Sequence, residues 1–351
     1  MQSRLTLPPS LTGRVTYVLE GVLISKGTYG YVHMGFNQAT REEVALKRLI
    51  LHNESVSGFP ITSLREIAIL RNIENPYCVK LYDVIASSGG GHIYLVFEYC
   101  EHDLDILLKE FKKPFAESEI KRIMLQLFHA INYLHQNSII HRDIKLSNLL
   151  YNNKGELKVA DFGLSRHMTD EIMTLKVVSL YYRAPELLLG TRKNYTTSID
   201  EWGCGCVLAE LLRGEALFIG ENELEVILRI FDILGAPNII IWPELMELEL
   251  IQSTVIDIHR ESLLKSYNNL QRYFSVDFSN EGFELLNLLL CYDPNKRITS
   301  KMASNHKYFY SSPLPQDESL MPTFPRRHFP TQGTNNKPQI IGGNDIFRQK
   351  K

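Results

Sequence analysis

The hydrophobic pattern divides the chain into a strand-rich first part and a helix-rich second part. Short apolar runs at 22–24, 31–34, 44–47 and 93–99 predict β-strands, and a glycine-bearing turn joins the first two runs. Between 60 and 71, apolar residues recur every three or four positions, which predicts one helix that begins at a proline. The first hundred residues are therefore expected to form a mainly-β unit with a single helix.

Beyond this part the apolar spacing becomes helical. Residues 117–136 carry an apolar stripe, whereas 202–212 are apolar on nearly every side, which predicts a buried central helix. Further helices are expected at 224–234 and 283–290. After Phe309 prolines recur and polar residues then dominate, so we expect a tail with little to bury, extended or disordered.

The whole chain of 351 residues suits two packed lobes better than one small domain. The pattern predicts an α+β fold with a small, mainly-β N-lobe containing one key helix and a larger, mainly-α C-lobe.

Composition narrows the class of protein. Lys plus Arg number 38 against 40 Asp plus Glu, and this balance gives no electrostatic footprint for nucleic acid. The five cysteines show no zinc spacing and are expected to be buried free thiols in a reducing compartment. The start of the chain lacks a secretory signal, and no apolar run approaches the ~20 residues of a membrane helix. We expect a soluble intracellular protein that binds neither a membrane nor nucleic acid directly.

Three motifs in a fixed order carry the candidate chemistry. They are His-Arg-Asp-Ile-Lys-Leu-Ser-Asn at 141–148, Asp-Phe-Gly at 161–163 and Ala-Pro-Glu at 184–186. Each triplet occurs by chance in many chains, but this order and spacing downstream of a lysine-ending strand does not. The set points to phosphoryl transfer, which depends on positioning and on neutralising charge.

The first two of these motifs supply the residues that are expected to carry out the transfer. Asp143 is expected to orient the attacking hydroxyl and accept its proton, and Lys145 to reach the transferred phosphate. Asp161 and the amide oxygen of Asn148 are oxygen ligands of the kind that Mg²⁺ takes.

Two upstream features complete the set. Ser25-Lys26-Gly27-Thr28-Tyr29-Gly30-Tyr31-Val32 is a turn whose glycines allow close approach to phosphates, although alone it is weak support. Lys47 ends an apolar strand and would contact the α- and β-phosphates of ATP if Glu66, on the following helix, fixes it.

On these motifs the chain resembles the eukaryotic protein kinases over about 15–309. The resemblance implies the two-lobed protein kinase fold, with an N-lobe (about 15–98), a hinge (about 98–103) and a C-lobe (about 104–309). An N-terminal extension (1–14) and a tail (310–351) would flank this domain. Lys145 is typical of the Ser/Thr kinases rather than the tyrosine kinases. The resemblance implies Phe97 as gatekeeper, Glu98 and Cys100 as the adenine-holding hinge, and Asp103 facing the ribose. It implies the following ATP-binding residues: Ile24, Ser25, Lys26, Gly27, Thr28, Tyr29, Gly30, Tyr31, Val32, Ala45, Lys47, Phe97, Glu98, Cys100, Asp103 and Leu150.

Within the kinases, the string Pro60-Ile61-Thr62-Ser63-Leu64-Arg65-Glu66 resembles the cyclin-facing helix of the cyclin-dependent kinases and is the hallmark of their PITSLRE subgroup. Tail motifs at 308–315 and 322–325 also resemble that subgroup. The resemblance implies a helix that rests swung out, with Lys47 and Glu66 apart, until a cyclin moves it inward.

The resemblance also implies regulation by phosphorylation. Thr174 matches the activating site, and phosphate there would pair with a clamp of three arginines, Arg65, Arg142 and Arg166. Thr28 and Tyr29 match inhibitory sites. Other matches concern the larger lobe: Val178 with Arg183 as a pocket for proline after the target residue, Glu186 with Arg297 as an ion pair, and Asp200 as a brace of the catalytic loop.

The resemblance therefore implies a serine/threonine kinase that uses ATP and Mg²⁺, prefers Ser/Thr-Pro sites and pairs with a cyclin, with L-type cyclins as the subgroup's partners. It also implies a place in transcription, pre-mRNA splicing or the cell cycle, and in the nucleus. Two alternatives stay open. One is another proline-directed kinase, although the mitogen-activated Thr-x-Tyr pair is absent at Thr174-Leu175-Lys176. The other is a pseudokinase scaffold, although such chains usually lose Lys47, Asp143 or Asp161.

Overall fold

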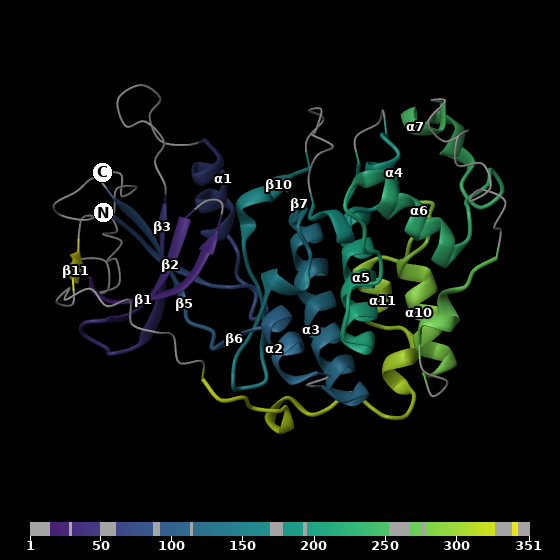
Figure 1. Cartoon of the computed structure of the whole chain (residues 1–351). Helices are drawn as coiled ribbons and strands as arrows, with labels where there is room; N and C mark the ends of the chain where they lie inside the picture. The colour runs from purple at the N-terminus through teal and green to yellow at the C-terminus, as the bar shows by residue number, and fades with distance from the viewer. Residues whose placement is uncertain are drawn as a thin grey trace, which may run out of the picture. The chain divides into compact units, whose positions relative to one another are not determined.

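The computed structural model describes residues 15–27, 30–49, 61–86, 92–112, 115–168, 178–191, 195–252, 267–274, 278–326 and 339–342. The predictions for the extension 1–14 and for Thr28, Tyr29, Pro60 and Thr174 lie outside these residues, as do those for the side chains of Lys26, Ile61 and Thr62. The chain forms two compact units (Figure 1). Unit 1 comprises 1–73, 79–100 and 326–351, and unit 2 comprises 74–78 and 101–325.

Unit 1 is built on an antiparallel sheet with the strand order β11-β1-β2-β3-β5-β4. Its core is a cluster that includes Val44, Leu46 and Val96, which are at most 1% exposed. The elements of unit 1 are β1 (Thr16–Gly27), β2 (Gly30–Asn37), β3 (Glu43–Leu49), α1 (Ile61–Leu70), β4 (Leu81–Ala86), β5 (Ile93–Glu98) and β11 (Gln339–Gly342).

The turn glycine Gly30 has a packing reason to be glycine. A Cβ at this position would lie 2.2 Å from the carbonyl oxygen of Arg48 on the neighbouring strand β3. Any side chain would therefore force β2 away from β3, whatever the turn binds.

Unit 2 is mainly helical, with α3 and α5 side by side at its centre (Figure 1). Its helices are α2 (Leu104–Phe111), α3 (Glu117–Gln136), α4 (Pro185–Leu188), α5 (Ser198–Arg213), α6 (Glu223–Leu234), α7 (Glu249–Gln252), α10 (Asn280–Leu289) and α11 (Ser300–Ala303). Its short strands are β6 (His102–Asp103), β7 (Ile139–Ile140), β8 (Leu149–Tyr151), β9 (Leu157–Val159) and β10 (Arg166–His167). The 3-10 helices are η2 (Leu146–Asn148), η3 (Phe162–Leu164), η4 (Leu180–Tyr182), η5 (Pro243–Glu247), η6 (Leu270–Tyr273), η7 (Lys307–Tyr310) and η8 (Glu318–Leu320).

The central helix is confirmed as buried on nearly every side. All residues of α5 from Ser198 to Leu211 are buried. Each large apolar side chain buried in this way contributes about 1.5–3 kcal/mol, so α5 is a rigid base for the loops that pack on it. The α+β class is confirmed, with a mainly-β unit and a mainly-α unit.

Residues 311–325 of the tail are extended, as expected, apart from the short 3-10 helix η8. These residues pack on unit 2, and Met321 is only 6% exposed. Composition did not reveal this packing, because side chains of unit 2 hold the segment by hydrogen bonds to its backbone carbonyls rather than by many buried apolar contacts. The chain then returns to unit 1, where Arg326 pairs with Glu43 at 2.7 Å and β11 pairs with β1.

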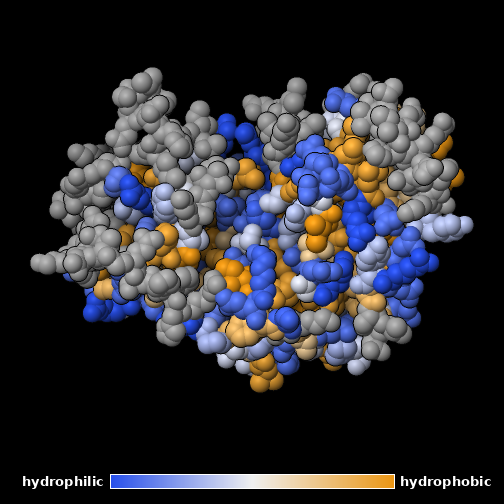
Figure 2. Space-filling model, viewed as in Figure 1, coloured by the Kyte–Doolittle hydropathy of each residue, from blue (hydrophilic) through white to orange (hydrophobic). Residues whose placement is uncertain are grey.

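The surface of the described residues is mixed in hydropathy. Figure 2 shows polar and apolar residues interspersed over the viewed face. Among the residues that the structure describes, no helix is long and apolar enough to cross a membrane.

Candidate active site

The loop between β7 and β8 holds Asp143 in a nearly closed ring of donors. One carboxylate oxygen of Asp143, Oδ2, accepts from Lys145 Nζ at 2.8 Å and from Asn148 Nδ2 at 2.9 Å. The other oxygen, Oδ1, accepts from the backbone N and the Oγ of Ser179, both at 3.0 Å. Burial favours the neutral acid, but the hydrogen bond and charge of Lys145 outweigh it and lower the pKa of Asp143 below its ordinary value. Asp143 is thus an ionised acceptor.

Ser179 is a functional residue that sequence analysis missed. Its Oγ also accepts from Lys145 Nζ at 2.7 Å, so one hydroxyl bridges both ends of the Asp143–Lys145 pair. The only sequence signal is a hydroxyl residue shortly before the Ala-Pro-Glu motif at 184–186.

The two predicted metal ligands suit a hard cation. The amide nitrogen of Asn148 donates to the backbone carbonyl and to the carboxylate of Asp143. The amide oxygen of Asn148 is therefore the atom that can bind a cation. Asp161 is exposed and adopts the left-handed conformation (φ 59°) at the start of η3, with Phe162 buried beside it. An exposed carboxylate and an amide oxygen fit a divalent ion that takes its other ligands from phosphate and water. Within the described ranges, His, Cys, Asp and Glu form no group of three or more that could hold a metal by themselves.

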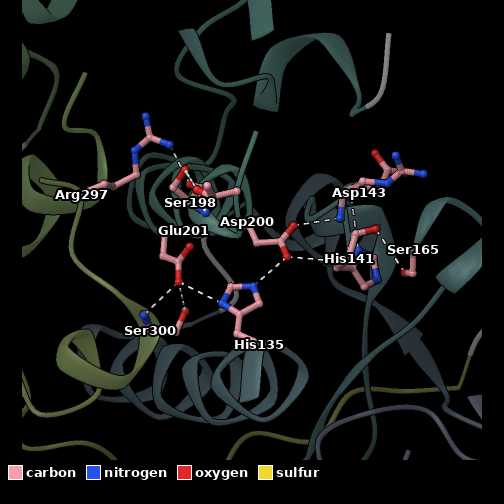
Figure 3. Close-up of polar contacts among 11 residues, drawn as sticks. His135, His141, Asp143, Ser165, Ser198, Asp200, Glu201, Arg297 and Ser300 are labelled. Carbon is pink, nitrogen blue, oxygen red and sulfur yellow. Dashed lines mark hydrogen bonds and ion pairs between the residues drawn. The ribbon is translucent and has the colours of Figure 1, made fainter. Parts of the chain in front are cut away.

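The predicted brace of the catalytic loop is confirmed (Figure 3). The buried carboxylate of Asp200, at the start of α5, accepts from the backbone N of His141 at 2.9 Å and from that of Arg142 at 2.8 Å. Arg142 has a positive φ of 68°, and these bonds help to hold that unfavourable conformation. Gly203 on α5 lets the loop approach, because a Cβ there would lie 2.9 Å from the Cβ of Ile144.

The sequence did not single out the rest of this network. His135, on α3, contacts Asp200 through Nε2 at 2.9 Å and Glu201 through Nδ1 at 3.1 Å (Figure 3). Glu201 in turn accepts from the backbone N and Oγ of Ser300. Burial works to lower the pKa of His135, but the hydrogen bonds and charges of the two carboxylates raise it to about 9.

The charge on His135 predicts a pH dependence of stability. Because its pKa rises from 6.5 unfolded to about 9 folded, its contribution is complete below pH 6.5 and is lost as pH rises through 9. We expect this loss to be on the order of 3 kcal/mol, which denaturant unfolding between pH 6 and 10 can measure. The His135→Gln variant, which cannot titrate, should be less stable at pH 6 and show a flatter profile. An identical pH profile in both proteins would contradict the assigned charge.

The three clamp arginines are not equivalent in the structure. Arg142 is buried, and its guanidinium donates to the hydroxyl of Tyr195 at 2.6 Å and to the carbonyl of Leu164 at 2.6 Å. Arg166, on β10, is partly buried in the same unit, whereas Arg65 is exposed on α1 of unit 1. Tyr195 is therefore a second residue that sequence analysis missed, and it orients Arg142.

In unit 1, Lys47 and Glu66 form an ion pair. The distance between Lys47 Nζ and Glu66 Oε1 is 2.6 Å, and both side chains are largely buried. The resemblance implied that these two residues rest apart, whereas the structure shows them paired.

The remaining predicted ATP-binding residues lie in both units. In unit 1, Val32 pairs with Lys47 and Ala45 pairs with Phe97 across adjacent strands, so these residues lie together in the sheet. Ile24 and Ser25 lie on β1, Gly30 and Tyr31 on β2, Glu98 ends β5, and Cys100 follows it, half-buried.

In unit 2, Asp103 pairs with Leu150 between β6 and β8. Asp103 also caps α2, accepting from the backbone N of Asp105 and of Ile106. Burial outweighs these bonds and raises the pKa of Asp103 to about 6.

Two further predictions concern the larger unit. The Glu186–Arg297 pair is confirmed as bidentate, with distances of 2.8 and 2.9 Å, and is fully buried on the arginine side. Arg183 pairs with Glu223 and donates to the carbonyl of Val178 at 3.0 Å. Val178 has a φ of 68°, which is costly for a β-branched residue and is typical of functional sites.

Comparisons with known proteins agree with this geometry. The sequence model of the protein kinase domain matches residues 19–309. The chain is 47% identical over 304 residues to a probable cyclin-dependent kinase 10 of Dictyostelium discoideum, a match that covers 86% of this chain and 81% of that protein. It is 42% identical over 306 residues to cyclin-dependent kinase 11B of Homo sapiens, covering 87% of this chain but 38% of the human protein.

A solved structure is also similar. A chain of the yeast RNA Pol II CTD kinase CTDK-1 complex superposes with a TM-score of 0.77 at 38% identity, covering 91% of this chain and 98% of that chain. The match over nearly the whole domain, together with the ring of donors around Asp143, decides the class. The chain belongs to the protein kinase family, as a serine/threonine kinase of the cyclin-dependent group close to its PITSLRE members.

Proposed function

We propose that this kinase transfers the γ-phosphoryl group of Mg·ATP to Ser/Thr-Pro sites through the residues described above. The observation that carries the proposal is Asp143, an ionised carboxylate with Lys145, Asn148 and Ser179 as donors. Asp143 orients the substrate hydroxyl and accepts its proton, because an ionised acceptor within reach is what general-base catalysis requires.

The other residues neutralise and position charge. Lys145 contacts the transferred group, and Lys47, held by Glu66, contacts the α- and β-phosphates. Asn148 and Asp161 would hold Mg²⁺, which, when bound, neutralises the charge that develops on the phosphate oxygens. In unit 1, Ile24, Val32, Ala45 and Phe97 would contact the adenine, with Glu98 and Cys100 at its edge. In unit 2, Leu150 would contact the adenine and Asp103 the ribose.

Regulation follows from the same residues. A cyclin would bind the helix that carries Leu64 and Arg65, both of which are exposed on α1. Phosphate on Thr174 would engage Arg65, Arg142 and Arg166, with Arg142 already oriented by Tyr195. Phosphate on Thr28 or Tyr29 would oppose ATP binding by like-charge repulsion.

The partner and the substrate class are proposed from relatives. The cyclin-dependent kinases in the comparison support a cyclin partner, and the PITSLRE likeness favours an L-type cyclin. The yeast neighbour is a kinase of the RNA Pol II CTD, which supports nuclear substrates in transcription. The balanced charge favours protein substrates over direct binding of nucleic acid.

Purification from cells tests this proposal. We expect the tagged chain to co-purify with a cyclin and to phosphorylate a Ser-Pro peptide, with Mg²⁺, much faster than the matched Ser-Ala peptide. The same chain purified alone should be far less active. Full activity of the lone chain would contradict cyclin dependence, and equal rates on the two peptides would contradict the proline preference.

A further inference from the structure

The segment 311–325, here called the C-terminal strap, is anchored on unit 2 by buried donors. Lys121, on α3, has no exposed side-chain surface and donates to the carbonyls of Ser311 at 3.0 Å and Pro313 at 2.7 Å. The neighbouring Arg122 donates through Nε to the carbonyl of Gln316 at 2.5 Å. Burying an ammonium group costs free energy unless its N–H groups donate to acceptors. The strap carbonyls are such acceptors, so Lys121 stabilises the strap in this position. Figure 1 shows this segment (yellow) running along the ends of α3 and α2.

The middle of the strap continues along the same face. Gln126 donates through Nε2 to Glu318 Oε2 at 3.2 Å. Gly155 lies against the strap so closely that a Cβ there would be 2.4 Å from the carbonyl oxygen of Glu318. The hydroxyl of Tyr151, on β8, donates to the carbonyl of Pro322 at 2.6 Å.

The strap ends at Phe324, which is fixed by backbone and ring contacts together. Asn153 accepts from the backbone N of Phe324 at 2.9 Å and donates to its carbonyl at 3.0 Å. The Phe324 ring contacts four aromatic side chains, with centroid distances of 5.8 Å to His102, 5.4 Å to Phe111, 5.5 Å to Phe115 and 6.1 Å to Tyr151.

These ring contacts lie directly beside two proposed nucleotide-binding residues. His102 pairs with Tyr151 and Asp103 pairs with Leu150 in the two-rung ladder between β6 and β8. Phe324 therefore packs on His102 and Tyr151, the residue pair that adjoins the pair Asp103–Leu150. It also packs on Phe111, at the far end of the helix that Asp103 caps.

We propose that Phe324 is a positioning residue for ATP: the strap holds the β6–β8 ladder, and through it the carboxylate of Asp103 and the side chain of Leu150, in the geometry that binds the nucleoside. This inference rests on the proposed nucleotide roles of Asp103 and Leu150. It gives a function to the tail motif Pro322-Thr323-Phe324-Pro325, which the catalytic residues leave unexplained.

The test compares full-length Phe324→Ala with a control in the same segment, Leu320→Ala, at a residue that is 67% exposed. We expect Phe324→Ala to raise KM for ATP about five- to tenfold with kcat changed less than about twofold, because loss of aromatic packing loosens a binding residue rather than the reacting groups. Leu320→Ala should match wild type, and Phe324→Tyr should restore most of the affinity. An unchanged KM for ATP in Phe324→Ala, or an equal fall in kcat, would overturn the inference.

A double-variant cycle separates this inference from the proposed function. Asp103→Asn keeps an N-cap acceptor but removes the charge, and it should raise KM for ATP by itself. If Phe324 acts through the ladder, the effects of Asp103→Asn and Phe324→Ala should be less than additive. Additive effects would overturn the role of Phe324 only. An Asp103→Asn variant with unchanged KM for ATP would instead overturn the proposed role of Asp103.

Discussion

Asp143→Asn is expected to lower kcat for phosphate transfer by at least about 10²- to 10⁴-fold, the usual contribution of a general base. ATP should still bind, because Asp143 contacts Lys145, Asn148 and Ser179 rather than the groups proposed to hold the nucleoside. In the wild-type protein, donors surround the carboxylate of Asp143. The NH₂ group of an asparagine would face these donors without an acceptor, and this mismatch should disturb the positions of Lys145 and Ser179. Single-turnover transfer and equilibrium binding of ATP measure the two quantities separately.

The matched control is Asp232→Asn on α6, where the carboxylate is 37% exposed and contacts Arg229 at 3.2 Å. This variant removes the same charge from the same unit and should retain wild-type turnover. If Asp143→Asn turns over as fast as Asp232→Asn, the assignment of Asp143 as the base is wrong.

Arg297→Ala is expected to destabilise the protein by about 3–5 kcal/mol, because it leaves a buried carboxylate without its partner. Glu186 is 4% exposed and loses both of its bonds to Arg297. The carbonyls of Ser198 and Tyr292 lose a donor as well. Denaturant-induced unfolding at pH 7 measures the loss.

The control for Arg297→Ala is Lys109→Ala, which breaks an equally short ion pair on the surface. Lys109 lies 2.7 Å from Asp105 but is 72% exposed, so the loss should be only about 0.3–0.5 kcal/mol. The double variant Glu186→Leu with Arg297→Leu should recover part of the stability, since no charge is then buried alone. Equal losses in Arg297→Ala and Lys109→Ala would contradict the burial argument.

Prediction from the sequence was most successful where the determinant is local. The helix at 117–136 has the same bounds in the structure, and the strand at 93–99 differs by one residue, because apolar spacing directly reports which face is buried. The packing of 311–325 on unit 2 was not predicted, because proline-rich composition does not reveal that Lys121 and Asn153, far away in the chain, supply partners for the backbone.

By itself, the sequence determined which chemical groups this kinase carries and in what order: an ammonium at Lys47, carboxylates at Asp143 and Asp161, and an amide at Asn148. Only the tertiary structure decided which side chains support the site. His135 pairs with Asp200, the hydroxyl of Ser179 donates to Asp143, and the ring of Phe324 packs on the β6–β8 ladder. The physical reason is that each motif consists of contiguous residues, so its chemical groups can be identified from the sequence alone. Burial and hydrogen bonding instead depend on segments that are tens or hundreds of residues apart and meet only when the chain packs.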